Sequence, residues 1–311
     1  MTNLPRFEPR RPLGKTGFRV TRIGTGDLAD RSVPLETCVA TLRRALEAGL
    51  NLVDTAPNYE DGYSEQVVGQ ALRGRREGVF LIDKVDHLDR PVEPQVAESL
   101  ERLGLDQVDL FAFHNVSSLD AYARLMQPGG AWDELEGCRR DGRCRFVGLS
   151  SHDPVVLRAA IEAGRAEVLM FPLGPFVDAR YVEEILPRTR ERGIGSVCFK
   201  TFGAGKLLGD TEGYGRELSQ RPRGKLSSGG ENQSEPTLPR LSIEECVRYT
   251  LTLDPDVTLL GMSFPNEQDA ALHAAKNFQP LSPSELEAVR ERARIAIRDK
   301  GPCWWNPPSP A

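Results

Sequence analysis

Residues 49–84, GLNLVDTAPNYEDGYSEQVVGQALRGRREGVFLIDK, form the stretch that decides the fold class. A short apolar run begins near Leu52, an amphipathic segment covers residues 64–72, and a second apolar run begins near Val79. Short β-branched runs predict strands, whereas apolar residues three or four positions apart predict a helix. A strand, a helix and another strand in this order are typical of a βαβ unit with parallel strands.

The same alternation continues along most of the chain. Further apolar runs begin near residues 23, 108, 146, 168, 194 and 257, and helices are predicted at 35–47, 95–103, 132–140, 154–163 and 182–192. Eight such strands predict an α/β fold of the closed (β/α)8 barrel (TIM barrel) type. An open, doubly wound sheet is the alternative. It is disfavoured because no G-x-G-x-x-G fingerprint follows a strand.

Three segments depart from this repeat. Residues 10–22 predict a β-hairpin with a turn at 15–17, placed to plug the bottom of the barrel. Residues 210–240 are polar and rich in Gly, Ser and Pro, and they predict a long loop ahead of a helix at 243–253. An additional C-terminal helix is expected at 283–298, before a tail at 299–311 that contains Trp304 and Trp305. We expect residues 1–311 to form a single domain.

Composition and charge narrow the class of protein. A formal net charge of −5 over 311 residues disfavours nucleic acid or an anionic membrane surface as a partner. Six scattered cysteines without a C-x-x-C pair indicate reduced thiols. The N-terminal segment lacks a signal-like apolar region, and no apolar run reaches membrane-spanning length. These features favour a cytoplasmic protein, and a monomer and a homodimer are both compatible with them.

Polar residues stand at the ends of three consecutive predicted strands. Asp54, Lys84 and His114 follow apolar runs at intervals of thirty residues, and Tyr59 lies in the loop after Asp54. Side chains at the carboxyl ends of barrel strands converge on one mouth, where barrel enzymes carry out their chemistry. The sequence therefore predicts a carboxylate, an ammonium, an imidazole and a phenol in one site.

This set of side chains suits the reduction of an aldehyde or ketone. Hydride addition to a carbonyl creates an alkoxide, which needs a proton as its charge develops. A phenol has an ordinary pKa of about 10, and the Lys84 ammonium is expected to lower the pKa of Tyr59. Asp54 is expected to hold Lys84 charged, and His114 to donate a hydrogen bond to the carbonyl oxygen.

A metal-dependent barrel enzyme is a second interpretation of the same residues. Asp54, His87 and His114 are the available ligands, and Asp86-His87 is the only suggestive pair. Metal sites generally need several carboxylate and histidine ligands, and no H-x-H motif is present. We therefore expect no metal site.

The residues around the four polar side chains resemble the aldo-keto reductase superfamily. The matching stretches are LGKTGFRVTRIGTG (13–26), ALEAGLNLVDTAPNYEDGYSEQVVGQAL (45–72), SLERLGLDQVDLFAFH (99–114), GRCRFVGLSS (142–151), GIGSVCFKTFGAGKLLG (193–209) and GMSFPNEQ (261–268). The resemblance implies NADPH bound across the barrel mouth and a small carbonyl substrate. It also implies that Tyr59 is the proton donor, Asp54 and Lys84 its supporting pair, and His114 the residue that orients the carbonyl.

The resemblance also implies a set of cofactor contacts. Around the nicotinamide these are Gly26, Asp54, Ser150, Ser151, Met170 and Phe199, and around the pyrophosphate Lys200, Phe202, Gly203, Gly205 and Lys206. Two of them depart from the family pattern. Ser151 replaces an asparagine, and Met170 replaces a glutamine and cannot make its hydrogen bond to the amide.

At the adenosine end the implied contacts are Gly261, Ser263, Glu267 and Gln268, beside a helix that begins near Asn266. The amides at the start of a helix bind phosphate well. Met262 and Gln268 stand where the family commonly has basic residues, so NADH remains possible beside NADPH. These departures leave a cofactor-binding regulatory barrel with little or no turnover as the alternative function. The 210–240 loop is expected to act as a lid ordered by the cofactor.

Overall fold

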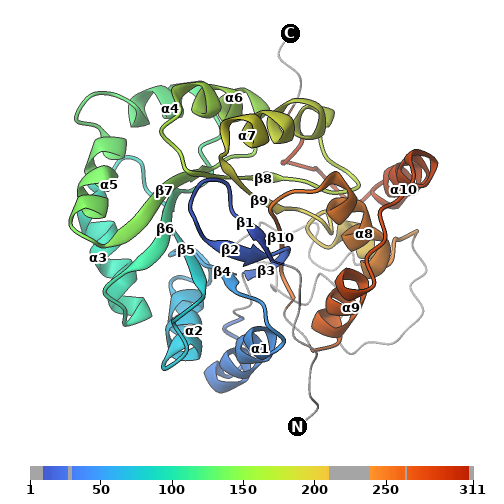
Figure 1. Cartoon of the computed structure of the whole chain (residues 1–311), viewed down its shortest axis with the longest axis horizontal. Coiled ribbons are helices and arrows are strands. Elements are labelled where there is room, and N and C mark those ends of the chain that lie inside the picture. The colour runs from blue at the N-terminus through green and yellow to red at the C-terminus, as the bar shows by residue number, and fades with distance from the viewer. Residues whose placement is uncertain (1–9, 27–29, 210–238, 263–264, 308–311) are drawn as a thin grey trace.

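The computed structural model describes residues 10–26, 30–209, 239–262 and 265–307. Eight parallel strands close into a barrel in the order β10-β3-β4-β5-β6-β7-β8-β9, which confirms the predicted (β/α)8 fold (Figure 1). The strands are β3 (Ile23–Gly26), β4 (Leu52–Asp54), β5 (Phe80–Val85), β6 (Val108–Phe113), β7 (Cys144–Ser150), β8 (Val168–Pro172), β9 (Gly195–Phe199) and β10 (Val257–Leu260).

Alternation along each strand separates two apolar cores. In β5, Phe80 and Ile82 belong to a cluster inside the barrel, whereas Leu81 and Val85 belong to the cluster between strands and helices. Successive side chains of a strand point to opposite faces, and a parallel sheet covered by helices is apolar on both. This is why the strands read as continuous apolar runs. The alternation also turns Lys84 inward and Asp83 outward.

Helices surround the barrel on all sides (Figure 1). They are α1 (Leu35–Glu47), α2 (Tyr63–Leu72), α3 (Val92–Leu103), α4 (Leu119–Leu125), α5 (Ala131–Arg140), α6 (Pro154–Ala163), α7 (Leu186–Arg192), α8 (Ile243–Leu253), α9 (Pro265–Lys276) and α10 (Pro283–Ala296). A π-helical turn, Tyr181–Ile185, precedes α7, and a short 3₁₀ turn, Lys206–Leu208, follows β9. The additional C-terminal helix α10 packs against α8 outside the ring.

The N-terminal hairpin closes one end of the barrel. Strands β1 (Arg10–Pro12) and β2 (Arg19–Thr21) pair antiparallel, and Leu13 is fully buried in the inner barrel cluster. Gly14 has φ +47°, and a Cβ there would lie 2.3 Å from the Gly195 nitrogen, so only glycine fits this contact. The predicted hairpin and its place at the barrel bottom are both observed.

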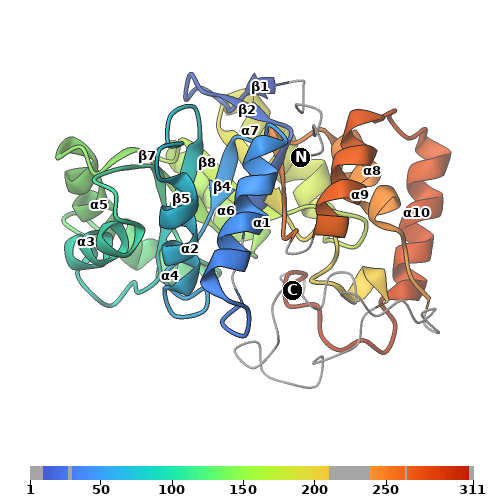
Figure 2. The same ribbon diagram turned by 90° about the horizontal axis from the view of Figure 1, so that it is seen from below.

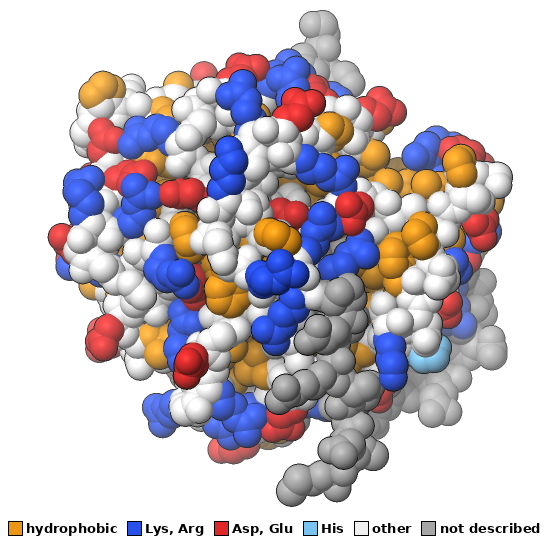
Figure 3. Space-filling view, in the orientation of Figure 1, with side chains coloured by type: hydrophobic (Ala, Val, Ile, Leu, Met, Phe, Trp, Pro, Cys, Tyr) orange, Lys and Arg blue, Asp and Glu red, His pale blue; other side chains and the backbone are white. Residues whose placement is uncertain are grey.

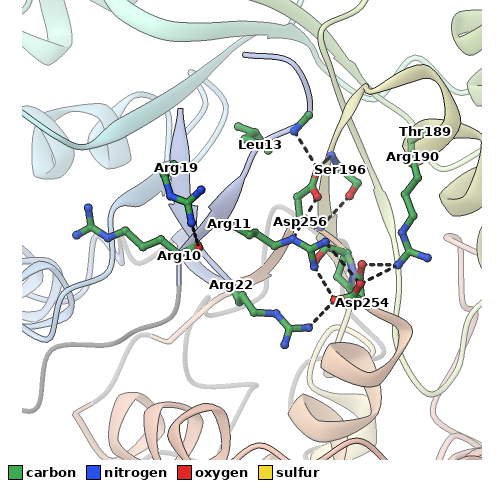
Figure 4. A network of polar contacts seen from close by, with 12 residues as sticks. Arg10, Arg11, Leu13, Arg19, Arg22, Thr189, Arg190, Ser196, Asp254 and Asp256 are labelled. Atoms are coloured by element: carbon green, nitrogen blue, oxygen red, sulfur yellow. Dashed lines mark hydrogen bonds and ion pairs between the residues drawn. The ribbon is translucent and has the colours of Figure 1, made fainter. Parts of the chain in front are cut away.

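Ion pairs hold this closed end together (Figure 4). Asp254 accepts from Arg11 at 2.5 Å and from Arg22 at 2.9 Å. Asp256 accepts from the backbone amides of Gly14 at 3.2 Å and Ser196 at 3.0 Å. Figure 3 shows acidic and basic side chains interspersed over this face of the molecule.

The C-terminal tail crosses the opposite end of the barrel from the hairpin (Figure 2). The Trp305 side chain is fully buried, and its indole N–H donates to the Phe176 carbonyl at 2.9 Å. Tyr181 donates to the Trp305 carbonyl at 3.1 Å. Trp305 therefore anchors the tail within the chain itself. The expected lid lies almost entirely outside the described residues. Within those residues, no helix combines the length and the apolar character needed to cross a membrane.

Candidate active site

The structure brings Asp54, Tyr59, Lys84 and His114 together at the carboxyl ends of β4, β5 and β6. These strands are neighbours, and Asp54 pairs in register with Ile82, as Lys84 does with Ala112. Asp54 ends β4 and Lys84 lies near the end of β5, while His114 directly follows β6. All three side chains occupy inward-facing positions, because each lies an even number of residues from an apolar side chain of the inner cluster.

Lys84 lies at the centre of the group. Its ammonium donates to the Asp54 carboxylate at 2.6 Å and to the Thr55 carbonyl at 2.6 Å. Both charged side chains are almost completely buried. Burial is the largest single influence and would lower the pKa of Lys84. The charge and hydrogen bond of Asp54, together with the charges of Tyr59 and Asp83, outweigh it, and the pKa of Lys84 is raised. Lys84 is therefore positively charged at physiological pH.

Tyr59 is presented by the loop between β4 and α2. Its ring lies beneath the Lys84 ammonium, 4.6 Å from nitrogen to ring centroid, and meets the His114 ring edge-on at 5.7 Å between centroids. The loop turns through left-handed residues at Glu60, Asp61 and Gly62 before α2 begins. This turn folds Tyr59 back over the barrel mouth, beside Lys84.

His114 contacts a carboxylate that the sequence did not identify as part of the site. Its Nδ1 hydrogen-bonds Oδ1 of Asp86, which lies just after β5. Burial lowers the pKa of His114 below its ordinary value, although the hydrogen bond to Asp86 opposes the shift. The strand period of two places Asp86 on the same face as Lys84, and this signal was available in the sequence.

The positions implied for the nicotinamide lie on the same inward faces. Ser150 ends β7 and Phe199 ends β9, and the Ser150 hydroxyl oxygen accepts from the Asn115 amide at 3.1 Å. The Ser151 hydroxyl instead accepts from the Asp153 amide at 3.0 Å, in the turn that starts α6. Met170 lies in the inner apolar cluster of the barrel. An ideal Cβ on Gly26 would lie 3.0 Å from the Asp54 Cβ, so this glycine lets the backbone of β3 approach Asp54 closely.

His152 is a second residue that the sequence did not single out. Its Nδ1 contacts the Asn115 side-chain oxygen at 2.9 Å, and its ring lies 5.1 Å from the Phe199 ring. Burial, with the nearby Lys200 and His114, lowers the pKa of His152 to about 3. His152 is therefore neutral. It follows Ser150 by two residues, so the same period would have pointed to it.

The implied pyrophosphate loop follows β9. Its backbone has positive φ at Lys200, Gly203, Ala204 and Gly205. Phe202 is buried in the core, and the Lys206 ammonium is also buried, where it donates to the Pro302 carbonyl at 2.6 Å. Lys200 lies over the Phe199 and Trp304 rings, at 5.4 and 5.3 Å from their centroids. The loop and the C-terminal tail are thus packed together.

The implied adenosine end lies where β10 leads into α9. Gly261 is partly exposed and Glu267 is buried, whereas Ser263 lies outside the described residues. The Gln268 amide donates to the Thr41 carbonyl at 2.9 Å, and its oxygen accepts from Arg44 of α1 at 3.1 Å. Arg44 also reaches the Pro265 carbonyl in the first turn of α9. The Arg44 side chain of α1 therefore lies at the start of α9.

A metal site gains no support from the geometry. Among the residues that the structure describes, no group of three or more His, Cys, Asp or Glu side chains is arranged to hold a metal ion. His87 is exposed, and its backbone is tied to the side chain of Gln95. The arrangement best matches proton transfer beside a buried cation.

Comparisons with known proteins agree on one family. The profile of the Aldo/keto reductase family matches residues 22–293. The NADH-specific methylglyoxal reductase of Escherichia coli (strain K12) is 29% identical over 227 residues, 64% of this chain and 68% of that protein. L-galactose dehydrogenase of Arabidopsis thaliana is 25% identical over 308 residues, 90% and 94% of the two chains.

Among solved structures, the holo form of aldo-keto reductase AKR11C1 from Bacillus halodurans matches with a TM-score of 0.72. The match covers 94% of this chain and 99% of that chain, at 23% sequence identity. It shows that the two proteins share a fold.

Proposed function

This chain belongs to the aldo/keto reductase family, and from that premise we propose that it is an NAD(P)H-dependent reductase with Tyr59 as proton donor. The family consists of oxidoreductases that act on carbonyl compounds, and the resemblance seen in the sequence is confirmed. The reaction proposed for this chain converts an aldehyde or ketone to the alcohol.

The observation that carries the proposal is the buried ammonium of Lys84 between Asp54 and the Tyr59 ring. A positive charge beside a phenol stabilises the phenolate that remains after the proton has left. In a buried site this stabilisation is stronger than in water, because the local dielectric constant is lower. Asp54 keeps the ammonium charged, so Tyr59 can give its proton to a developing alkoxide.

The residues present fit a nicotinamide cofactor in part. The Phe199 ring at the end of β9 offers a flat apolar surface for a pyridine ring. The Ser150 oxygen already accepts from an amide, which leaves its hydroxyl hydrogen to donate to a carboxamide. The orientation of Ser151 and the apolar Met170 supply no further partner there. When bound, the reduced nicotinamide supplies the hydride.

At the adenosine end we propose that NADPH binds and that NADH is also accepted. Arg44 stands at the start of α9, where its charge would attract a 2′-phosphate. Its side chain is also paired with Asp269 at 2.5 Å, and this carboxylate competes with a phosphate for the guanidinium. We therefore expect only a modest preference between the two dinucleotides. One relative is named as NADH-specific, and both cofactors should be tested.

The substrate proposed is a small carbonyl compound. The names of two relatives, a methylglyoxal reductase and a galactose dehydrogenase, direct the first assays to small dicarbonyls and to aldoses. Neither name fixes the substrate of this chain.

The test compares two tyrosines that lie four residues apart. Tyr59→Phe should lower the single-turnover rate of aldehyde reduction by roughly 10²–10⁴-fold, because it removes the proton donor. Tyr63→Phe is the matched control. The Tyr63 hydroxyl donates to the Val33 carbonyl at 2.9 Å, so its loss should affect stability and leave the rate near wild type.

Nucleotide binding is measured in parallel by quenching of tryptophan fluorescence with NADPH and NADH. Binding by both variants, together with a loss of rate in Tyr59→Phe alone, would support the proposal. Tight binding without Tyr59-dependent turnover of any substrate would contradict it and favour the regulatory barrel instead.

A further inference from the structure

The Asp86 side chain joins two parts of the site that the proposed reaction treats separately. Its Oδ1 contacts Nδ1 of His114, and its Oδ2 accepts from the Asn58 amide at 2.7 Å. Asn58 directly precedes Tyr59 in the loop. The Asp86 side chain is only 6% exposed. One carboxylate therefore contacts both the imidazole and the backbone that carries the phenol.

These contacts determine which nitrogen of His114 carries the proton. An ionised carboxylate only accepts hydrogen bonds, so the His114 nitrogen that faces it must be the donor. Neutral imidazole has one N–H, and here that N–H is at Nδ1. Its Nε2 then carries a lone pair and no hydrogen. A positively charged imidazole would carry a hydrogen on each nitrogen.

We propose that Asp86 is a positioning residue that fixes the proton of His114 on Nδ1, so that Nε2 donates to a carbonyl only when His114 is charged. This inference rests on the proposed function. It concerns how the protonation state of His114 determines whether the site binds the carbonyl or the alcohol form of the substrate.

The reason lies in the hydrogen-bonding capacity of the two substrate forms. A carbonyl oxygen has no hydrogen and can only accept hydrogen bonds. A lone pair on Nε2 of His114 would repel it, so both Tyr59 and His114 must donate to it. An alcohol has one hydrogen and can face one donor and one acceptor. When the carbonyl form is bound, Tyr59 and His114 must each point a hydrogen at the substrate oxygen. When the alcohol form is bound, only one of them does, so the pair carries one proton fewer. Reduction then requires the charged imidazole.

Several groups face His114 and influence its charge. Asp86 after β5 and Asp54 on β4 favour the charged form, whereas Lys84 on β5 and the buried surroundings disfavour it. Tyr59, in the loop after β4, packs against the ring, and neutral His152 lies beyond β7. Burial and Lys84 prevail, so the pKa of His114 lies below its ordinary value. Reduction should therefore decline as the pH rises through the lowered pKa of His114.

The tautomer can be observed directly by NMR. Two-bond ¹H–¹⁵N spectra distinguish Nδ1–H from Nε2–H imidazoles, and the chain has four histidines to assign, with His114→Asn identifying the relevant signal. At pH 8 the wild-type protein should show His114 protonated on Nδ1. A proton on Nε2 would overturn the proposal. This measurement needs neither substrate nor cofactor, and it needs no variant of Asp86.

Asp86→Asn should reverse the tautomer. The amide oxygen of the variant can accept from the Asn58 amide, and its NH₂ group would then donate to Nδ1 of His114. The single imidazole proton would move to Nε2, which could donate to a carbonyl without an additional charge. A His114 that keeps its proton on Nδ1 in the folded variant would contradict the assignment of this role to Asp86.

The pH profile of carbonyl reduction gives the second readout. In the wild type, kcat/KM should fall about tenfold per pH unit above the pKa of His114. In Asp86→Asn this decline should begin at least one pH unit higher. Asp89→Asn changes an exposed carboxylate of the same loop and should leave the profile as in the wild type.

A structural role alone would give a different result. It would lower the rate of Asp86→Asn without moving the decline to higher pH. The decline would then begin at lower pH, because the variant lacks the carboxylate that favours the charged imidazole, and this result would overturn the proposal. If the wild type reduces no carbonyl with either cofactor, the proposed function fails. The NMR spectrum still decides the tautomer in that case.

Discussion

At the residue scale, the central feature is an ion pair placed where water is nearly absent. Lys84 and Asp54 are 2% and 3% exposed, so each charge depends on the other for its stability. Pairs of this kind contribute little net stability compared with apolar side chains of similar size, whereas removal of one partner is costly. We infer that the pair is kept for its effect on Tyr59.

Lys84→Met tests this interpretation of the pair. The variant should lose carbonyl reduction by orders of magnitude and still bind the dinucleotide. It should also lose about 3–5 kcal/mol of unfolding free energy, because Asp54 is left buried without its partner. Urea unfolding and single-turnover rates measure the two effects.

The double variant Asp54→Asn/Lys84→Met separates stability from activity. It should recover part of the lost stability, because no unpaired charge remains buried, while its rate stays as low as that of the single variant. Recovery of the rate together with the stability would show that Lys84 acts only through folding.

Several residues of the candidate site could be predicted from the sequence because they end strands. Asp54, Lys84 and His114 follow apolar runs, and the parallel barrel brings such ends together. Asp86 and His152 lie one strand period beyond recognised positions, in segments without strong patterning. Arg44 could not be anticipated, because it reaches α9 from α1 and only the tertiary packing brings the two together.

At the scale of single elements, β5 carries an ionisable side chain on each of its two faces. Lys84 points into the barrel, whereas Asp83 points outward and is fully buried with Glu65 of α2, which is bound to Arg102 of α3. Burial and the neighbouring Glu65 hold the pKa of Asp83 well above its ordinary value. The same strand therefore carries, directly behind the site, a carboxyl group whose ionised form is destabilised by burial.

Asp83→Asn should raise stability, and by more at pH 8 than at pH 5. A carboxyl whose pKa is raised on folding stabilises the native state below its unfolded pKa of about 3.9, and that contribution is lost as the pH rises through the folded pKa. The amide stays neutral throughout. Asp106→Asn, at an exposed position, is the control, and an equal gain for both variants would contradict the assignment.

Most elements were predicted because their apolar spacing is strong and long. Residues 35–47 and 154–163 were expected as helices and form α1 and α6 with those bounds. The short helix α4, Leu119–Leu125, was missed, since seven residues hold too few apolar positions to show a helical period. The helix expected at 182–192 begins as a π-helical turn. This irregularity accompanies a tertiary contact, since Tyr181 in that turn donates to the tail.

At the scale of the whole molecule, the two ends of the barrel have separate tasks. The hairpin and its ion pairs close the amino-terminal end, and the candidate site occupies the carboxyl-terminal end. This division is general in such barrels, where one face supports stability and the other catalysis.

Leu13→Ala should therefore affect stability alone. Leu13 is fully buried in the inner cluster, and its truncation should cost about 2–5 kcal/mol of unfolding free energy. The turnover of the folded variant should match the wild type. Arg10→Ala, at an exposed position of the same hairpin, should change stability by less than about 0.5 kcal/mol. A lower turnover in Leu13→Ala at a temperature where it is folded would show that the two ends are coupled.

The central claim is that Tyr59, beside the Lys84 ammonium, completes the transfer of a hydride to a carbonyl carbon. Reduced dinucleotide carrying deuterium at both positions on C4 of the nicotinamide, mixed with an aldehyde and the protein, tests it most directly by mass analysis of the alcohol. The account predicts one deuterium on the carbinol carbon with the wild type and Tyr63→Phe, and almost none over the same time with Tyr59→Phe. Deuterium transfer by Tyr59→Phe at the wild-type rate, or an alcohol formed without deuterium, would contradict it.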